Sequence, residues 1–197
     1  MSKQKRQRGV IYAVIAALLF ISTPTLTSAD DAQTASSTPP LRVPPKVIYG
    51  QYSRHFVASL AWPSTISPQQ KDGFNFCVVG AESEVKLPPA TKWRLNVPLV
   101  VVDANDRDDA FVAANCHAVF IGLSQERRLS SIIGSIGRLP VLTISPIEGF
   151  VSRGGMFGLI YVGESIRFTI NRKAIEASGL RIVDPRVLDL AVPGGKS

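Results

Sequence analysis

The chain has 197 residues, of which 45% are hydrophobic and 19% are charged, and its formal net charge is +7. Four of its 22 Lys and Arg residues lie in the first eight positions, so 18 remain against 15 Asp and Glu, a charge of +3. These residues are scattered, whereas a nucleic-acid-binding surface needs a basic stripe with interleaved aromatic residues. Composition and charge therefore argue against a nucleic-acid partner.

The N-terminal segment has the three parts of a secretory signal peptide. A basic stretch precedes the apolar run from Val10 to Ile21, and the small residues Thr27 and Ala29 stand just before Asp30. The alternative is an N-terminal anchor helix, but this run of twelve residues is shorter than the roughly 20 that span a bilayer. The sequence predicts a signal peptide at residues 1–29, cleavage after about Ala29, and a periplasmic protein without a membrane span.

The next segment, residues 30–45, is polar, rich in Ser and Thr, and interrupted by proline. It buries too little apolar area to offset the entropy lost on ordering, so we expect a flexible linker. The folded domain is then expected at residues 46–192, followed by a short tail at 193–197. A domain of this size suits a single hydrophobic core.

The first half of the domain is expected to alternate helix and strand. Residues 46–63 place apolar residues at helical spacing and end at Pro63, which predicts an amphipathic helix. Three short apolar runs predict strands, and their lack of polar alternation is typical of strands covered on both faces. These runs are residues 74–80, 99–103 and 117–122. The acidic start of residues 104–116 predicts a short helix between the last two strands.

The second half continues the alternation and ends in a hairpin. Ser124 is the expected N-cap of a helix that ends at Gly137, and residues 141–145 predict the next strand. Two further strands, 158–163 and 165–171, are predicted to form a tight hairpin. Short helices are expected at residues 172–180 and 184–191. The sequence therefore predicts a single-domain α/β sandwich whose largely parallel sheet is flanked by helices and carries one antiparallel hairpin near the C-terminus.

The glycine-rich stretch "SPIEGFVSRGGMFG" raises the question of a phosphate site. Gly149 and Gly154 have the spacing of a G-x-x-x-x-G-K-[ST] loop, but Gly155 and Met156 stand where the lysine and the hydroxyl are needed. The element that follows is predicted to be a strand, so no helix N-terminus faces a phosphate. We interpret the stretch as a connection whose glycines supply positive φ angles.

The histidines and cysteines do not have the spacing of a metal site. Cys116 and His117 are adjacent in a predicted strand, where neighbouring side chains point to opposite faces. Spacing alone leaves a nucleophilic pair of Cys77 and His55 open. Because both cysteines follow the predicted leader, an oxidising compartment favours a disulfide between Cys77 and Cys116. The alternative is two buried free thiols.

Other catalytic and metal patterns are incomplete. "DANDRDD" at residues 103–109 lacks the later ligands of a calcium loop, and its acidic residues suit a helix N-terminus. No G-x-S-x-G elbow of a serine hydrolase occurs. We therefore expect no enzymatic activity, no metal and no cofactor.

Several longer stretches occur together in a characteristic order. "FNFCVVG", "NCHAVFIG" and "LPVLTISPIEGFVSRGGMFGLIYVGESIRFTINRKAIEASGLRI" resemble the YfiR family of periplasmic regulators, from about Lys46 to Ala191. The resemblance implies an α/β domain that often dimerises and that binds the periplasmic part of an inner-membrane diguanylate cyclase, holding it inactive. Cys77 and Cys116 match the family's bridging pair. The chain lacks the second cysteine pair of some members, and Pro88-Pro89 stand where relatives tend to have a helix.

The leading hypothesis is an exported, non-enzymatic regulator that binds an inner-membrane sensor protein with a periplasmic domain and represses its output. We expect the glycine loop to contribute the contact surface, because Arg and Phe on a loop are frequent anchors. Its residues are Ile147, Glu148, Phe150, Arg153 and Met156. The alternative for Phe150 and Met156 is packing in the core.

Two other classes of protein remain as alternatives. A periplasmic small-ligand binding protein would have a pocket at the carboxyl ends of the parallel strands. A thiol oxidoreductase would have an accessible cysteine of low pKa.

Overall fold

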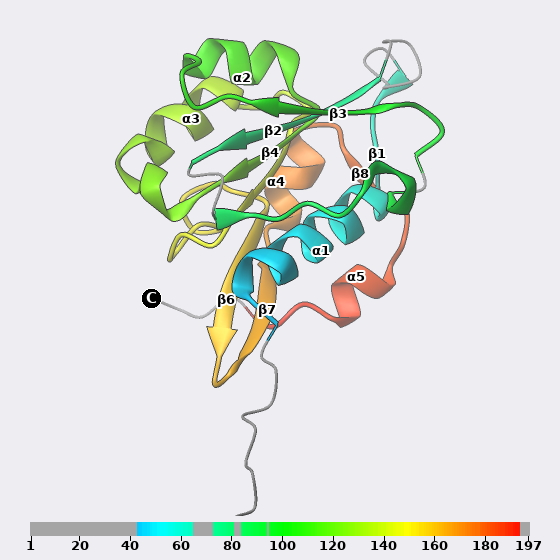
Figure 1. The fold of residues 1–197 in the computed structure, drawn as a ribbon, viewed down its shortest axis with the longest axis vertical. Coiled ribbons are helices and arrows are strands. Elements are labelled where there is room, and N and C mark those ends of the chain that lie inside the picture. The colour runs from blue at the N-terminus through cyan, green and yellow to red at the C-terminus, as the bar shows by residue number, and fades with distance from the viewer. Residues whose placement is uncertain (1–42, 65–72, 81–83, 94, 194–197) are drawn as a thin grey trace, which may run out of the picture. The chain divides into compact units, whose positions relative to one another are not determined.

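The computed structural model describes residues 43–64, 73–80, 84–93 and 95–193 (Figure 1). The predicted signal peptide, most of the predicted linker and most of the tail lie outside the described residues. Among the described residues, no helix combines the length and the apolar character needed to cross a membrane.

A six-stranded sheet with the strand order β3-β2-β4-β5-β6-β7 forms the centre of the fold (Figure 1). The pairings from β3 through β6 are parallel, and β6 and β7 are antiparallel. The strands are β2 Phe74–Val79, β3 Leu99–Asp103, β4 Ala118–Ile121, β5 Leu142–Ser145, β6 Phe157–Val162 and β7 Ser165–Ile170. The predicted fold class, including the antiparallel hairpin, is confirmed.

Helices lie on both sides of this sheet, and a small two-stranded sheet pairs β1 with β8. The helices are α1 Pro45–Ala58, α2 Asp109–Asn115, α3 Leu129–Ile136, α4 Arg172–Ala177 and α5 Arg186–Asp189, with 3-10 turns η4 Ala90–Lys92 and η5 Leu123–Arg128. The short strands are β1 Leu60–Ala61 and β8 Arg181–Ile182.

Two hydrophobic clusters pack against the central strands. In β2, Phe74 and Phe76 belong to the cluster that contains α1, whereas Cys77 and Val79 belong to the cluster that contains residues of α2 and α3. Successive side chains of a strand point to opposite faces, so both faces of β2 are covered. The mostly apolar runs of β2 and β4 are explained by this burial on both faces.

The edge strand β3 departs from that prediction. Its side chains are exposed or half-buried, with Val100 43% and Val101 53% exposed. β3 pairs only with β2 and so lies at the end of the sheet. Its apolar run was expected to be covered on both faces, and its edge position explains the difference.

Helix α1 ends earlier than its sequence pattern predicts. The helix stops at Ala58, and Leu60 then pairs with Ile182 of β8. Backbone pairing with a distant segment therefore ends the helix before Pro63 does. The core-facing Phe56 is fully buried and stacks on Phe157, with ring centroids 4.1 Å apart.

The predicted start of the third helix is also corrected. Residues 123–128 form the 3-10 turn η5, and α3 begins only at Leu129, so Ser124 is not its N-cap. The carboxylate of Glu84 instead accepts hydrogen bonds from the backbone N–H groups of Leu123 and Ser124. The expected end at Gly137 is confirmed, and that residue has a φ of 52°.

The hairpin of β6 and β7 extends beyond the carboxyl end of β5. Only Ile144 and Ser145 of β5 pair with β6, through Phe157 and Gly158. The rest of β6 pairs with β7 alone, up to the turn at Gly163. The hairpin end therefore projects from the sheet, as Figure 1 shows.

Candidate functional site

The glycine-rich loop between β5 and β6 is an internally bonded turn. Gly149 and Gly154 have φ angles of 66° and 98°, which confirms the expected positive φ values. The backbone N–H of Arg153 donates to Gly149 at 3.0 Å, and that of Gly155 donates to the Phe150 carbonyl at 3.0 Å. These amides are already satisfied, so they do not form a cradle for a phosphate.

Gly155 has a packing role in this loop. A Cβ atom at Gly155 would overlap the ring of Phe150, which is almost fully buried. The ring of Phe150 can pack in the cluster that contains α3 only because Gly155 has no side chain. Close packing of an aromatic ring, rather than ligand binding, explains this glycine.

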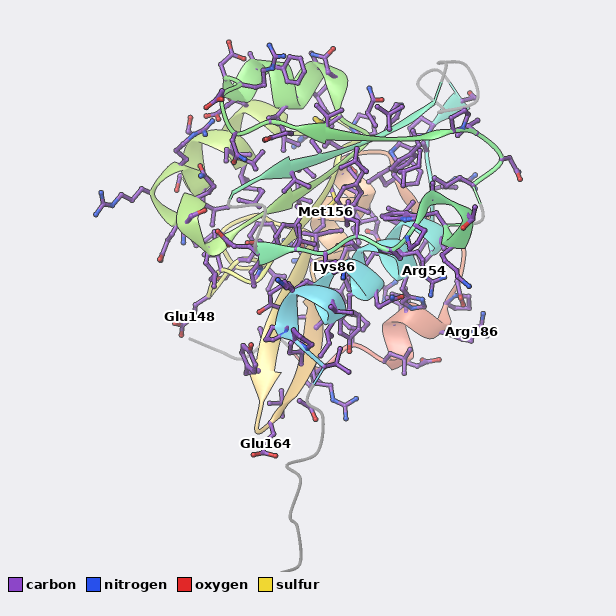
Figure 2. All side chains as sticks on the ribbon, in the orientation of Figure 1. Arg54, Lys86, Glu148, Met156, Glu164 and Arg186 are labelled. Carbon is purple, nitrogen blue, oxygen red and sulfur yellow. A yellow bond between two sulfur atoms is a disulfide. The ribbon has the colours of Figure 1, made fainter. Side chains whose placement is uncertain are left out.

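The five loop residues expected to contact a partner are divided by the fold. Ile147, Phe150 and Met156 are buried in the core, as the sequence alternative for Phe150 and Met156 held. Their side chains pack on the sheet and are not on the surface. Glu148 and Arg153 are exposed, and Figure 2 shows Glu148 at the periphery and Met156 inside the fold.

Arg153 joins the loop to the neighbouring turn η5. Its guanidinium lies 3.9 Å from the carboxylate of Glu126 and donates to the Glu126 carbonyl at 3.4 Å. Both side chains are partly or largely exposed, so this ion pair adds little to stability. It places the exposed part of the loop beside the turn that follows β4.

Exposed apolar side chains gather at the same end of the sheet. We call Leu123 and Tyr161, which are 55% and 60% exposed, the hairpin-end surface; Val162 is 49% exposed but follows Tyr161 in β6 and so points to the other face of the strand. Leu123 and Tyr161 line one cleft of about 350 Å³, together with Glu84 and residues from the start of α1. Burial, and then hydrogen bonding to Tyr161, raise the pKa of Tyr49, which lines the same cleft.

This cleft lies where the small-ligand hypothesis expects a pocket, at the carboxyl ends of parallel strands. Its lining combines the exposed apolar side chains of Leu123 and Tyr161 with the charged side chains of Lys46 and Glu84, and the Glu84 carboxylate already accepts hydrogen bonds from the backbone that follows β4. An exposed apolar surface is more typical of a protein contact. Sequence analysis missed it because Tyr161 and Val162 belong to an apolar run that resembles a buried strand.

The two cysteines form a disulfide between β2 and the residue that follows α2. The Cα atoms of Cys77 and Cys116 are 5.8 Å apart, and both residues are buried. The bridge ties β2 to the segment that leads into β4. A bonded, buried Cys77 is not a nucleophile, so the structure argues against the pair with His55 and against a thiol oxidoreductase.

The two histidines have structural surroundings. His117 is buried just before β4, its Nδ1 accepts a hydrogen bond from the Asn75 backbone at 2.9 Å, and its ring stacks on Phe74. His55 is half-buried on α1, and desolvation lowers its pKa. Within the described ranges, no group of three or more His, Cys, Asp or Glu is arranged to hold a metal ion.

Comparison with known proteins identifies the family. The YfiR/HmsC-like family model matches residues 48–192, which is most of the chain and the whole described α/β domain except its ends. The chain belongs to the YfiR/HmsC-like family. This confirms the resemblance inferred from the motifs, and the family supports a periplasmic regulator of diguanylate cyclase signalling.

A solved structure is also similar to this chain. It is the crystal structure of a conserved domain protein from Vibrio cholerae O1 biovar El Tor, with 15% sequence identity and a TM-score of 0.46. The match covers 60% of this chain and 53% of that one, so it spans about half the length of the Vibrio protein.

Proposed function

We propose that the protein binds the periplasmic part of an inner-membrane diguanylate cyclase and represses its synthesis of cyclic-di-GMP. The family match across residues 48–192 is the observation that carries this proposal. A regulator of this kind acts by binding, so it needs a stable scaffold and an exposed contact surface. The disulfide and the two-sided core supply the first, and the hairpin-end surface is our candidate for the second.

The hairpin-end surface has properties that suit a protein contact. Leu123 and Tyr161 are large apolar side chains that are more than half exposed. Tyr in particular is enriched at the centres of interfaces, where its ring is buried and its hydroxyl finds a partner. The exposed loop residues Glu148 and Arg153 are proposed to form the polar rim of the same contact.

The proposal is tested by measuring cellular cyclic-di-GMP together with partner capture. Deleting the gene should raise cyclic-di-GMP, and the full chain supplied in trans should restore the lower level. Cross-linking in intact cells should capture a membrane protein with a periplasmic domain and a cytosolic cyclase domain. Unchanged cyclic-di-GMP after deletion, or a captured partner without a cyclase domain, would contradict the proposal.

A matched pair of variants locates the surface. Leu123→Asp should abolish capture and repression, because a carboxylate in the apolar contact would be desolvated without a partner. Leu139→Asp is the control: Leu139 is 45% exposed but lies just before the start of β5, at the other end of the parallel strands. If both variants repress normally while deletion still raises cyclic-di-GMP, the proposed repressor function stands and the hairpin-end surface is not the contact.

A second copy of the chain is proposed as a further partner. The edge strand β3 exposes Val100 and Val101, and an apolar edge strand is prone to pair with another strand. Sedimentation should detect a dimer that Val101→Lys disrupts. A monomer at all concentrations would contradict this part of the proposal.

A further inference from the structure

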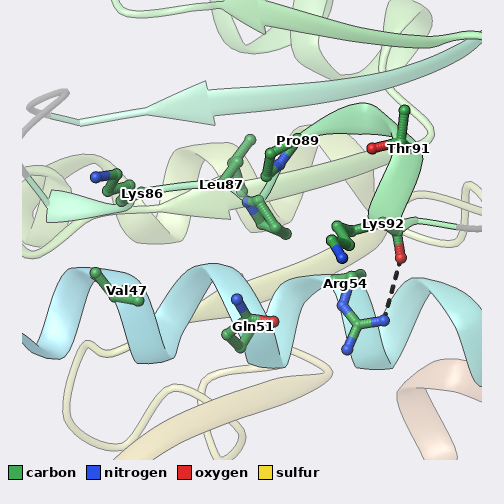
Figure 3. Close-up of a pocket in the computed structure, with 9 residues that line it drawn as sticks. Val47, Gln51, Arg54, Lys86, Leu87, Pro89, Thr91 and Lys92 are labelled. Atoms are coloured by element: carbon green, nitrogen blue, oxygen red, sulfur yellow. Dashed lines mark hydrogen bonds between the residues drawn. The ribbon is translucent and has the colours of Figure 1, made fainter. Parts of the chain in front are cut away.

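A cleft between α1 and the segment that follows β2 is lined by basic side chains (Figure 3). Its volume is about 610 Å³, within the range of roughly 300–1,000 Å³ that is common for small-molecule sites. Arg54, Lys86 and Lys92 line it, and its described lining residues include no Asp or Glu. We propose that this cleft binds an elongated small organic dianion with a carboxylate or phosphate group at each end.

The positive charges stand at the two ends of the cleft. The backbone N–H of Lys86 donates to the carbonyl of Lys46 in the first turn of α1, at 2.9 Å. The guanidinium of Arg54, near the other end of α1, donates to the carbonyl of Lys92 at 3.2 Å. From Val47 to Arg54 the helix rises about 10 Å. Figure 3 shows Lys86 near Val47 at one end and Lys92 near Arg54 at the other.

Apart from its three cations, the cleft is lined mainly by apolar side chains. Two prolines and two aliphatic side chains form its walls, and one amide and one hydroxyl side chain add neutral hydrogen-bonding groups. These residues are Val47, Leu87, Pro88, Pro89, Gln51 and Thr91. A hydrocarbon or ring body between two anionic groups matches this order of charge, apolar wall and charge.

The wall opposite α1 is held in place before any ligand binds. The indole of Trp93, itself buried, donates to the carbonyl of Pro88 at 3.0 Å. At the other end, the Lys86 carbonyl approaches Gly50 so closely that a Cβ atom there would overlap it. A cleft with fixed walls loses little entropy when a ligand enters.

The charges of the three cations are not neutralised within the cleft, although the Arg54 guanidinium donates one hydrogen bond to the Lys92 carbonyl. None of them forms an ion pair with another residue in the described part of the chain. The nearby carboxylate of Asp184 is already held by Arg186, through two contacts at 2.9 Å. Like charges around one cleft repel each other, and an anion relieves that repulsion. The site therefore selects for negative charge.

The test is calorimetric titration of the protein, obtained from the full chain, at low salt. The probes are octanedioate, which has a carboxylate at each end, and octanoate, which has only one. Octanedioate should bind saturably at one site and about tenfold or more tightly than octanoate, because it makes a second charge-assisted contact. High salt should weaken both.

Variants that remove one charge distinguish binding in the cleft from general attraction of an anion to a basic protein. Lys86→Gln and Lys92→Gln should each lower octanedioate affinity about tenfold and remove its advantage over octanoate. Both lysines are exposed, so neither change should disturb folding. Lys173→Gln, an exposed lysine on α4 outside the cleft, is the matched control and should bind as the wild type does.

Three results would overturn the inference: no saturable binding of octanedioate, equal binding of both probes, or equal losses in the cleft and control variants. If the cleft variants instead lose a captured membrane partner while the wild type binds neither probe, the cleft is a protein contact and not a dianion site. The binding test does not depend on the proposed regulatory function, so either can fail without the other.

Discussion

The backbone carbonyl of Lys86 lies so close to Gly50 of α1 that a methyl group on Gly50 would overlap it. Glycine inside a helix is unfavourable by about 1 kcal/mol relative to alanine. Close approach of a second segment explains why α1 nevertheless has a glycine at this position. The contact joins α1 to the wall of the basic cleft, beside the backbone hydrogen bond from Lys86 to Lys46.

Gly50→Ala should therefore destabilise the protein by about 1–3 kcal/mol, the usual range for overpacking. Helix propensity alone predicts a change of the opposite sign. Gly134→Ala on α3 is the control, because a Cβ atom there meets nothing within 4 Å; it should stabilise the protein by up to about 1 kcal/mol. The measurement is urea-induced unfolding of both variants, and equal stability of the two would contradict the packing argument.

The contact between Gly155 and Phe150 makes a second prediction about overpacking. Gly155→Ala should lower the free energy of unfolding by about 1–3 kcal/mol, because the new methyl group enters the space of the buried ring. Phe150→Leu vacates part of that space, so the double variant should lose less than the sum of the two single changes. Strict additivity in a double-mutant cycle would show that the ring and the glycine do not interact.

The disulfide between Cys77 and Cys116 should contribute strongly to stability. It closes a loop with a sequence separation of 39, for which the chain-entropy estimate is about 4 kcal/mol. The double variant Cys77→Ala/Cys116→Ala should have a free energy of unfolding lower by about this amount, measured by urea-induced unfolding. Reductant should destabilise the wild type and leave the double variant unchanged. If reductant leaves the wild-type midpoint unchanged, the bridge either does not form or does not support the fold.

Local patterns predicted the core strands well, and long-range relationships account for the errors. The apolar runs of β2 and β4 are local features, and both are strands as expected. The run of β3 is just as apolar, yet its place at the sheet edge is a property of the topology. The end of α1 and the Glu84 contacts at Leu123 likewise depend on partners distant in sequence.

The candidate surfaces follow the same rule. Tyr161 is exposed because β6 extends past the end of β5, and strand register is not visible in a short apolar run. Arg54 and Lys92 meet across 38 positions of sequence, so no motif indicates their cleft. One sequence feature did point to this region: Pro88-Pro89 predicted a local departure from the family, and both prolines form part of the cleft wall.

The surroundings of His55 predict how stability depends on pH. Burial lowers the pKa of His55, and the neighbouring cations Arg54 and Arg186 act in the same direction, while Asp184 opposes them. The unfolded chain, with an ordinary histidine pKa of about 6.5, then binds a proton more readily than the folded protein does. Stability from the neutral ring is therefore present above that pH and is lost as the pH falls through the folded value.

His55→Gln removes this titration and leaves His117 in place. The measurement is the free energy of unfolding of both proteins from pH 7.5 to pH 5, because the difference between the two curves isolates His55. The wild type should lose stability relative to the variant as the pH falls below about 6.5. Parallel curves would show that His55 has the same pKa in the folded and unfolded states. If the wild type became more stable than the variant as the pH falls, the attraction of Asp184 would outweigh the effect of burial on the pKa of His55.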